Sequence, residues 1–152
     1  MKYNKLILIL IFAFSAAFTQ AQSNVFDKLS ERKDIQAVHV NKSLLEMLPK
    51  METGGVDIAG LVNKLDQLDI YTSEANEAIK YMNSLFDFFD KDKAYENFMS
   101  LKEKDQKVVF YGKQDNGTFK DLVMIVSELN KCTIIRMRGS FTAKDIQNIM
   151  KK

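Results

Sequence analysis

The sequence predicts an α+β domain, with a mainly antiparallel sheet that ends in a C-terminal three-stranded meander and packs against several helices. The last third of the chain carries three runs rich in β-branched residues, and Asn116-Gly117 between the first two is a strong hairpin signal. The middle of the chain carries apolar residues that step by three or four from Ala75 to Phe89, which is the period of a helix face. Helices grouped beside an antiparallel meander are typical of the α+β class.

The N-terminus is predicted to be a cleaved signal peptide, residues 1–21. Lys2 and Lys5 precede an apolar run that is shorter than the roughly 20 residues of a membrane span, and small residues lead to a cleavage site between Ala21 and Gln22. A lipid anchor needs a cysteine directly after the cut, but the only cysteine is Cys132. We therefore expect an exported, periplasmic or secreted protein, not transmembrane after cleavage and without a lipid anchor.

Charge argues against nucleic acid as a partner. The chain has 22 basic and 20 acidic residues, and loss of the two leader lysines leaves 20 of each. Nucleic-acid binding needs a basic excess on one face, which a chain of zero net charge does not provide. The remaining 131 of the 152 residues, 22–152, suit one domain. A single cysteine forms no internal disulfide, so apolar burial must stabilise this domain.

Short helices and strands are predicted to alternate in the first half of the exported chain. They are a helix at 24–32, a strand at Ile35–Asn41, a helix at 42–51 with a Ser43/Glu46 capping box and a break at Pro49, a turn at Gly54-Gly55, one or two helical turns within 57–65, and a strand at Leu68–Thr72.

The second half begins with a long helix that Ser73 caps, and Asp90–Lys93 interrupts it. The spacing of Tyr95, Phe98, Met99 and Leu101 predicts that a further helix follows and ends near Asp105. Three strands then follow, with turns at Asn116-Gly117 and at 128–131. A last helix is capped by Thr142 and Asp145.

The two turns set the register of the meander. The first turn predicts Phe110 opposite Val123, and the second predicts Asp121 opposite Arg138. One sheet face is then apolar along most of its length. The other has an apolar centre and polar ends, and its expected members are Val108, Phe110, Asp121, Val123, Ile125, Ser127, Cys132, Ile134, Arg136 and Arg138. An apolar centre needs cover, which the chain's own helices, a partner or second copy, or a ligand could provide.

The sequence indicates no catalytic, metal or cofactor site. One histidine, His39, and one cysteine, Cys132, are too few for a zinc site. The acidic run at 87–96 lacks the spacing and central glycine of a calcium loop. Cys132 lies in a β-branched run with no feature that lowers its pKa, so we expect a buried thiol. Met82, Phe86, Phe89, Phe98 and Met99 are expected to be core residues.

Asp121, Arg136 and Arg138 form the candidate partner-facing surface. The two arginines point to the same side of one strand, and a pair of guanidinium groups can grip a carboxylate or an acidic partner. The alternative is an ordinary cross-strand pair between Asp121 and Arg138, with Arg136 in solvent.

The segments "AVHVNKSLLEML", "DIYTSE" and "GKQDNGTFKDLVMIVSELNKCTIIRMRGSFTAKDI" resemble a Bacteroidetes family of small exported proteins whose domain has no known function. The resemblance covers nearly all of the exported chain, and it implies an envelope location and an α+β fold. It supplies no catalytic residue to transfer. Some relatives resemble lipoproteins, but this chain lacks the cysteine they use.

The sequence thus predicts a non-enzymatic binding domain whose partner is a protein or another envelope component, with a homodimer as a further option. The main alternative is a carrier or sensor of a small apolar ligand held between helices and sheet. A hydrolase that uses His39 or Cys132 is the third hypothesis, and it lacks a recognisable catalytic motif.

Overall fold

The computed structural model describes residues 23–47, 52–53, 56–57 and 59–150, with side chains over 25–47 and 60–148. The predicted signal peptide, Pro49 and the Gly54-Gly55 turn lie outside the described residues. The chain divides into two compact units, Met1–Lys33 and Asp34–Lys152. In the first unit, helix α2 spans Ser23–Glu31, close to the predicted helix, and its Val25, Phe26 and Leu29 side chains are buried.

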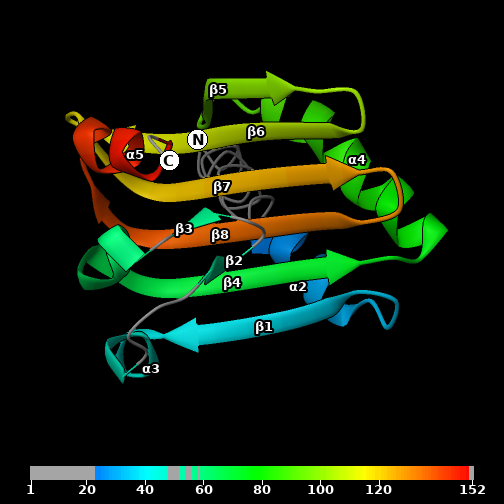
Figure 1. The fold of residues 1–152 in the computed structure, drawn as a ribbon, viewed down its shortest axis with the longest axis horizontal. Helices are drawn as coiled ribbons and strands as arrows, with labels where there is room; N and C mark the ends of the chain where they lie inside the picture. The colour runs from blue at the N-terminus through cyan, green and yellow to red at the C-terminus, as the bar shows by residue number, and fades with distance from the viewer. Residues whose placement is uncertain (1–22, 48–51, 54–55, 58, 151–152) are drawn as a thin grey trace, which may run out of the picture. The chain divides into compact units, whose positions relative to one another are not determined.

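The second unit is built around a six-stranded antiparallel sheet (Figure 1), and its strands run in the spatial order β1-β4-β8-β7-β6-β5. The strands are β1 (Gln36–Asn41), β4 (Leu65–Ser73), β5 (Glu96–Lys102), β6 (Gln106–Asp115), β7 (Thr118–Glu128) and β8 (Cys132–Phe141). The predicted three-stranded meander is β6-β7-β8, and β5 extends it by one strand. The α+β prediction is therefore confirmed. A separate two-stranded hairpin pairs β2 (Glu52–Thr53) with β3 (Val56–Asp57).

Helix α4 (Asn76–Lys91) connects β4 to the far edge of the sheet. Four strand spacings separate β4 from β5, which is about 19 Å at 4.8 Å each. A helix of 16 residues is about 24 Å long, enough to cross that distance. The chain then returns strand by strand until β8 lies beside β4. This connection places α4 over one face of the sheet.

The opposite face carries the main apolar core. Helices α3 (Lys42–Met47) and α5 (Ala143–Met150) and the 3₁₀ helix η1 (Ala59–Lys64) cover it, and Figure 1 shows α3 and α5 on the near side of the sheet. The buried side chains of this core are Val40, Leu45, Leu61, Leu65, Leu68, Val108, Phe110, Phe119, Leu122, Met124, Val126, Ile135, Met137, Phe141 and Ile146.

Helix α4 covers the apolar centre of the second face. The Phe89 ring stacks on Tyr111, with centroids 5.3 Å apart, and the Tyr111 hydroxyl donates to Asp90 at 2.9 Å. Met82 and Phe89 on the helix are buried, as are Val123, Ile125 and Ile134 on the sheet. The chain's own helix therefore fills the region for which a partner or ligand was an alternative.

A β-bulge shifts the register of the first hairpin. The Asn116-Gly117 turn forms as predicted, with φ of 49° and 78°, and Asp115 pairs with Thr118. Between Lys113 and Gln114 the pairing then slips by one residue, so Phe110 faces Met124 instead of Val123. Because side chains alternate between faces, Val108 and Phe110 join the main core, contrary to the prediction. The second hairpin has the predicted register from Ser127 opposite Cys132 to Asp121 opposite Arg138, and it shifts by one residue between Asp121 and Phe119.

A second bulge explains why a helix was wrongly predicted after Tyr95. This segment is strand β5, and its pairing with β6 slips between Asn97 and Met99. Phe98 and Met99 consequently both pack against the main core, although they are consecutive. Two adjacent inward residues break the period of two and imitate helical spacing.

The helix caps agree only partly with the prediction. Thr142 and Asp145 form the expected capping box, in which Asp145 accepts from the Thr142 backbone N–H at 2.7 Å. Helix α3 is capped by Asn41, whose side chain accepts from the Leu44 N–H at 3.1 Å, and not by Ser43. Ser73 lies before α4 and accepts from the Ala75 N–H.

Among the described residues, no helix has the length and apolarity that a membrane crossing requires.

Candidate functional site

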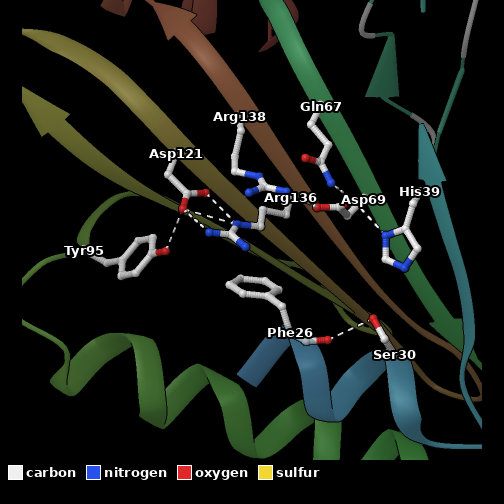
Figure 2. A network of polar contacts seen from close by, with 9 residues as sticks. All are labelled: Phe26, Ser30, His39, Gln67, Asp69, Tyr95, Asp121, Arg136 and Arg138. Atoms are coloured by element: carbon white, nitrogen blue, oxygen red, sulfur yellow. Dashed lines mark hydrogen bonds and ion pairs between the residues drawn. The ribbon is translucent and has the colours of Figure 1, made fainter. Parts of the chain in front are cut away.

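One end of the α4-facing side of the sheet holds a group of polar side chains that we name the polar cluster (Figure 2). Strand alternation aims these side chains to one face, because His39, Asp69 and Arg136 are consecutive partners across β1, β4 and β8. Gln67, Arg138 and Asp121 form the neighbouring row across β4, β8 and β7. The members of the polar cluster are His39, Gln67, Asp69, Tyr95, Asp121, Arg136 and Arg138.

Asp121 and Arg136 form a largely buried ion pair. The Arg136 Nη2 donates to Asp121 Oδ2 at 2.7 Å, and its Nε lies 3.1 and 3.2 Å from the two carboxylate oxygens. The Tyr95 hydroxyl donates to the same carboxylate at 3.0 Å. Only 17% of the Arg136 side chain and 10% of the Asp121 side chain are exposed. Three donors from two side chains therefore hold Asp121 inside the fold.

The electrostatics of this pair favour its charged form. Burial acts to lower the pKa of Arg136, but hydrogen bonding and the charge of Asp121 outweigh it and raise that pKa above its usual value. Burial, and then the Asp121 charge, raise the pKa of Tyr95 well above that of a free phenol. Arg136 therefore stays protonated and Tyr95 stays a hydroxyl donor at neutral pH.

The sequence-based pairing of Asp121 with Arg138 assigns the wrong arginine to this carboxylate. Asp121 lies directly opposite Arg138, as predicted, but its carboxylate bonds to Arg136 on the diagonal. Long side chains reach diagonal neighbours across a sheet, so the opposite position alone does not select the partner. Arg136, which was expected in solvent under that pairing, is consequently the more buried of the two arginines.

Arg138 turns instead toward Asp69 on β4. Its Nη2 lies 3.4 Å from Asp69 Oδ2, while Gln67 Nε2 donates to Asp69 Oδ1 at 2.9 Å. His39 Nδ1 lies 2.8 Å from the same Oδ1, and since a carboxylate only accepts, the ring N–H is the donor. The Asp69 side chain is 3% exposed. Asp69, Gln67 and His39 were not among the predicted site residues. Asp69 had one signal, an acid inside the apolar strand "LDIYT".

The exposed members of the polar cluster are basic. Exposure of the side chain reaches 39% for Arg138 and 50% for His39, whereas both acids are buried. Arg138 Nε is buried and has no hydrogen-bond partner among the described residues. Of the three predicted site residues, Asp121 and Arg136 are thus bonded to each other inside the fold, and Arg138 has the most exposed side chain of the three.

Cys132 and His39 are not brought together. Cys132 pairs with Ser73 and Ser127, four residues along β8 from the row of His39, which is about 13 Å. Burial, followed by the charge of Glu128, raises the pKa of the Cys132 thiol to about 12. A buried, protonated thiol is a poor nucleophile and a poor metal ligand.

The acidic side chains of the run at 87–96 accept hydrogen bonds from other groups of the fold. Asp90 accepts from Tyr111, Asp92 accepts from the Ala94 N–H at 2.9 Å, and Glu96 accepts from Gln114 at 2.7 Å. The described part of the chain contains no group of three His, Cys, Asp or Glu side chains placed to hold a metal ion.

Fold and site together define an α+β domain with an antiparallel sheet, helices on both faces and a polar cluster at one end of the α4 face. The chain belongs to the family described as domain of unknown function DUF4252, whose model matches residues 26–149. No curated protein and no solved structure matches the chain.

Proposed function

We propose that this protein is an exported, non-enzymatic binding domain that recognises an acidic group of a protein or another envelope component through Arg138. The apolar centre of the second sheet face, which first suggested a partner, is covered by α4. The proposal therefore rests on the polar end of that face.

The observation that carries the proposal is the contrast between the two arginines. Arg136 makes three contacts of 2.7–3.2 Å with one carboxylate, whereas Arg138 makes one contact at 3.4 Å and leaves Nε without a partner in the described chain. A guanidinium has five N–H donors, and leaving buried donors unsatisfied is unfavourable. The Arg138 side chain is 39% exposed, so an incoming carboxylate or other oxyanion would contact the guanidinium N–H groups that reach the surface, in the planar geometry that arginine favours.

The arrangement of charges supports an acidic ligand group. Asp69 and Asp121 balance the two arginines inside the cluster, but both acids are buried while Arg138 and His39 reach the surface. The basic groups are therefore the ones a partner meets first. Asp69 accepts three hydrogen bonds, which hold Arg138 and His39 on one side of the sheet.

Chemical cross-linking in the envelope of the producing cell, followed by capture and mass spectrometry, tests the proposal. Three forms are compared: the native chain, Arg138→Gln, and Lys144→Gln. Lys144 is exposed on α5 on the opposite side of the sheet, so it matches the loss of one positive charge. We expect a specific set of captured components that Arg138→Gln loses and Lys144→Gln keeps. Equal capture by all three forms would refute the role of Arg138.

Export has its own test. Mass spectrometry of the protein isolated from its host should show an N-terminus at Gln22, because the leader combines a short apolar run with small residues before the cut. A protein that retains Met1 or Lys2 and stays inside the cell would contradict the export part of the proposal and leave Arg138 to be judged by capture alone.

A further inference from the structure

The two edges of the sheet differ in how they are protected against strand pairing. Edge strand β5 carries Glu96 and Lys102, and its ladder to β6 is interrupted by a bulge. Edge strand β1 has neither device, because "QAVHVN" contains no Lys, Arg, Asp, Glu or proline and pairs with β4 over six residues without a register shift. Charges, prolines and bulges are the usual means by which an exposed edge avoids another strand. The β1 edge therefore lacks the features that block strand addition.

Exposed apolar side chains gather beside this unprotected edge. The described residues hold five exposed large hydrophobic side chains, and three of them lie on β1 and on α3, which directly follows it. They are Val38, Leu44 and Met47, with exposed fractions of 41%, 45% and 77%. Val38 shares its sheet face with Val40, and α3 covers that same face through Leu45. The edge thus combines a strand with one neighbour in the described sheet and an apolar flank on one side.

We propose that β1 pairs with β1 of a second copy of this chain, antiparallel and edge to edge, so that the sheet continues across a two-fold axis. A second copy supplies a strand of the same length that also lacks charged residues and proline, so the edge is complementary to itself, as a two-fold interface requires. Like-charge repulsion is small, because the formal charge is +2 for the whole chain and zero after the expected cleavage.

The register of this pairing is limited by side-chain alternation. The axis must pass through a residue, so that opposed side chains share a face, and the two central residues of β1 are Val38 and His39. An axis through His39 sets two imidazole rings opposite each other and sets exposed Val38 against Val40, which is already buried. An axis through Val38 sets the two exposed valines opposite each other and buries both. We therefore place the axis at Val38.

Disulfide trapping tests both the pairing and its register in the full chain. Val38→Cys places two thiols opposite each other on the axis, at a Cα separation within the 4.4–6.8 Å that a disulfide accepts. Leu101→Cys is the matched control, because Leu101 is 45% exposed on the other edge strand. The native Cys132 is buried and its pKa is raised to about 12, so it does not compete.

Under mild oxidation we expect Val38→Cys to form a covalent dimer and Leu101→Cys to remain monomeric. Light scattering of the native chain should show twice the chain mass at high concentration, and Val38→Lys should remove that species while Leu101→Lys keeps it. A native chain that is monomeric at every concentration, with no more disulfide dimer from Val38→Cys than from Leu101→Cys, would overturn the proposal. Trapping by His39→Cys in place of Val38→Cys would overturn the register. None of these outcomes depends on Arg138.

Discussion

Replacing Asp121 with asparagine should destabilise the fold far more than replacing Arg138 with glutamine. Asp121→Asn removes the carboxylate charge that is hydrogen-bonded to the Arg136 guanidinium, whose side chain is 17% exposed. Breaking one side of a buried ion pair costs about 3–5 kcal/mol, and the partial exposure of Arg136 places the expected loss near the lower end, about 3 kcal/mol. Arg138→Gln removes a contact of 3.4 Å from a side chain that is 39% exposed, so we expect a loss of about 1 kcal/mol or less.

Urea unfolding followed by far-ultraviolet circular dichroism measures both losses, which suits a chain without tryptophan. With an m-value of about 1.5 kcal/mol per molar urea, the midpoint of Asp121→Asn should fall by about 2 M, and that of Arg138→Gln by well under 1 M. Tyr95→Phe removes only the hydroxyl donor, and it should cost about 1–2 kcal/mol in the native background and less in Asp121→Asn. Equal midpoints for Asp121→Asn and Arg138→Gln would refute this assignment of roles.

Three further predictions concern packing, pH and thiol reactivity. Gly139→Ala should cost about 3 kcal/mol in urea unfolding or prevent folding, because its Cβ would overlap the Lys64 carbonyl oxygen, whereas Gly60→Ala meets no atom within 4 Å and should be nearly neutral. Hydrogen bonds from Lys64 and Thr142 lower the pKa of Asp145 to about 2 from 3.8, so its stabilisation is complete above pH 4 and is lost as pH falls toward 2; Asp145→Asn should flatten the stability profile in that window. Cys132 should resist iodoacetamide at pH 8 in the folded chain and react fully in urea, as followed by mass; labelling of the folded chain at the unfolded rate would contradict its burial.

The sequence predicts most of the architecture because local signals carry it. The Asn-Gly turn, the turn at 128–131 and the apolar stripe of α4 depend on residues close in the chain. The sequence does not predict the register shifts of the sheet, among them the bulges near Gln114 and Phe98, because the extra residue of a bulge is set by sheet twist and by packing between distant strands. The bulge near Gln114 placed Val108 and Phe110 on the other face of the sheet, and the bulge near Phe98 gave strand β5 a helix-like spacing of apolar residues.

In the candidate site, too, the sequence predicts what local patterns determine and misses what depends on contacts between distant strands. Alternation along β8 predicts that Arg136 and Arg138 share a face, and the register places Asp121 opposite Arg138. The choice of Arg136 as the partner of Asp121 depends on side-chain reach, and the recruitment of Asp69 depends on β4 lying beside β8. Residues 69 and 138 are far apart in the chain, and no local pattern links their strands.

The most direct test of the central claim is to measure envelope capture for Arg138→Gln and Asp121→Asn under conditions where circular dichroism shows both to be folded. If Arg138 recognises the partner and Asp121 serves the fold, Arg138→Gln will lose the captured components at near-native stability, and Asp121→Asn will keep them despite its lower urea midpoint. Undiminished capture by Arg138→Gln, with loss of capture in folded Asp121→Asn, would contradict the account.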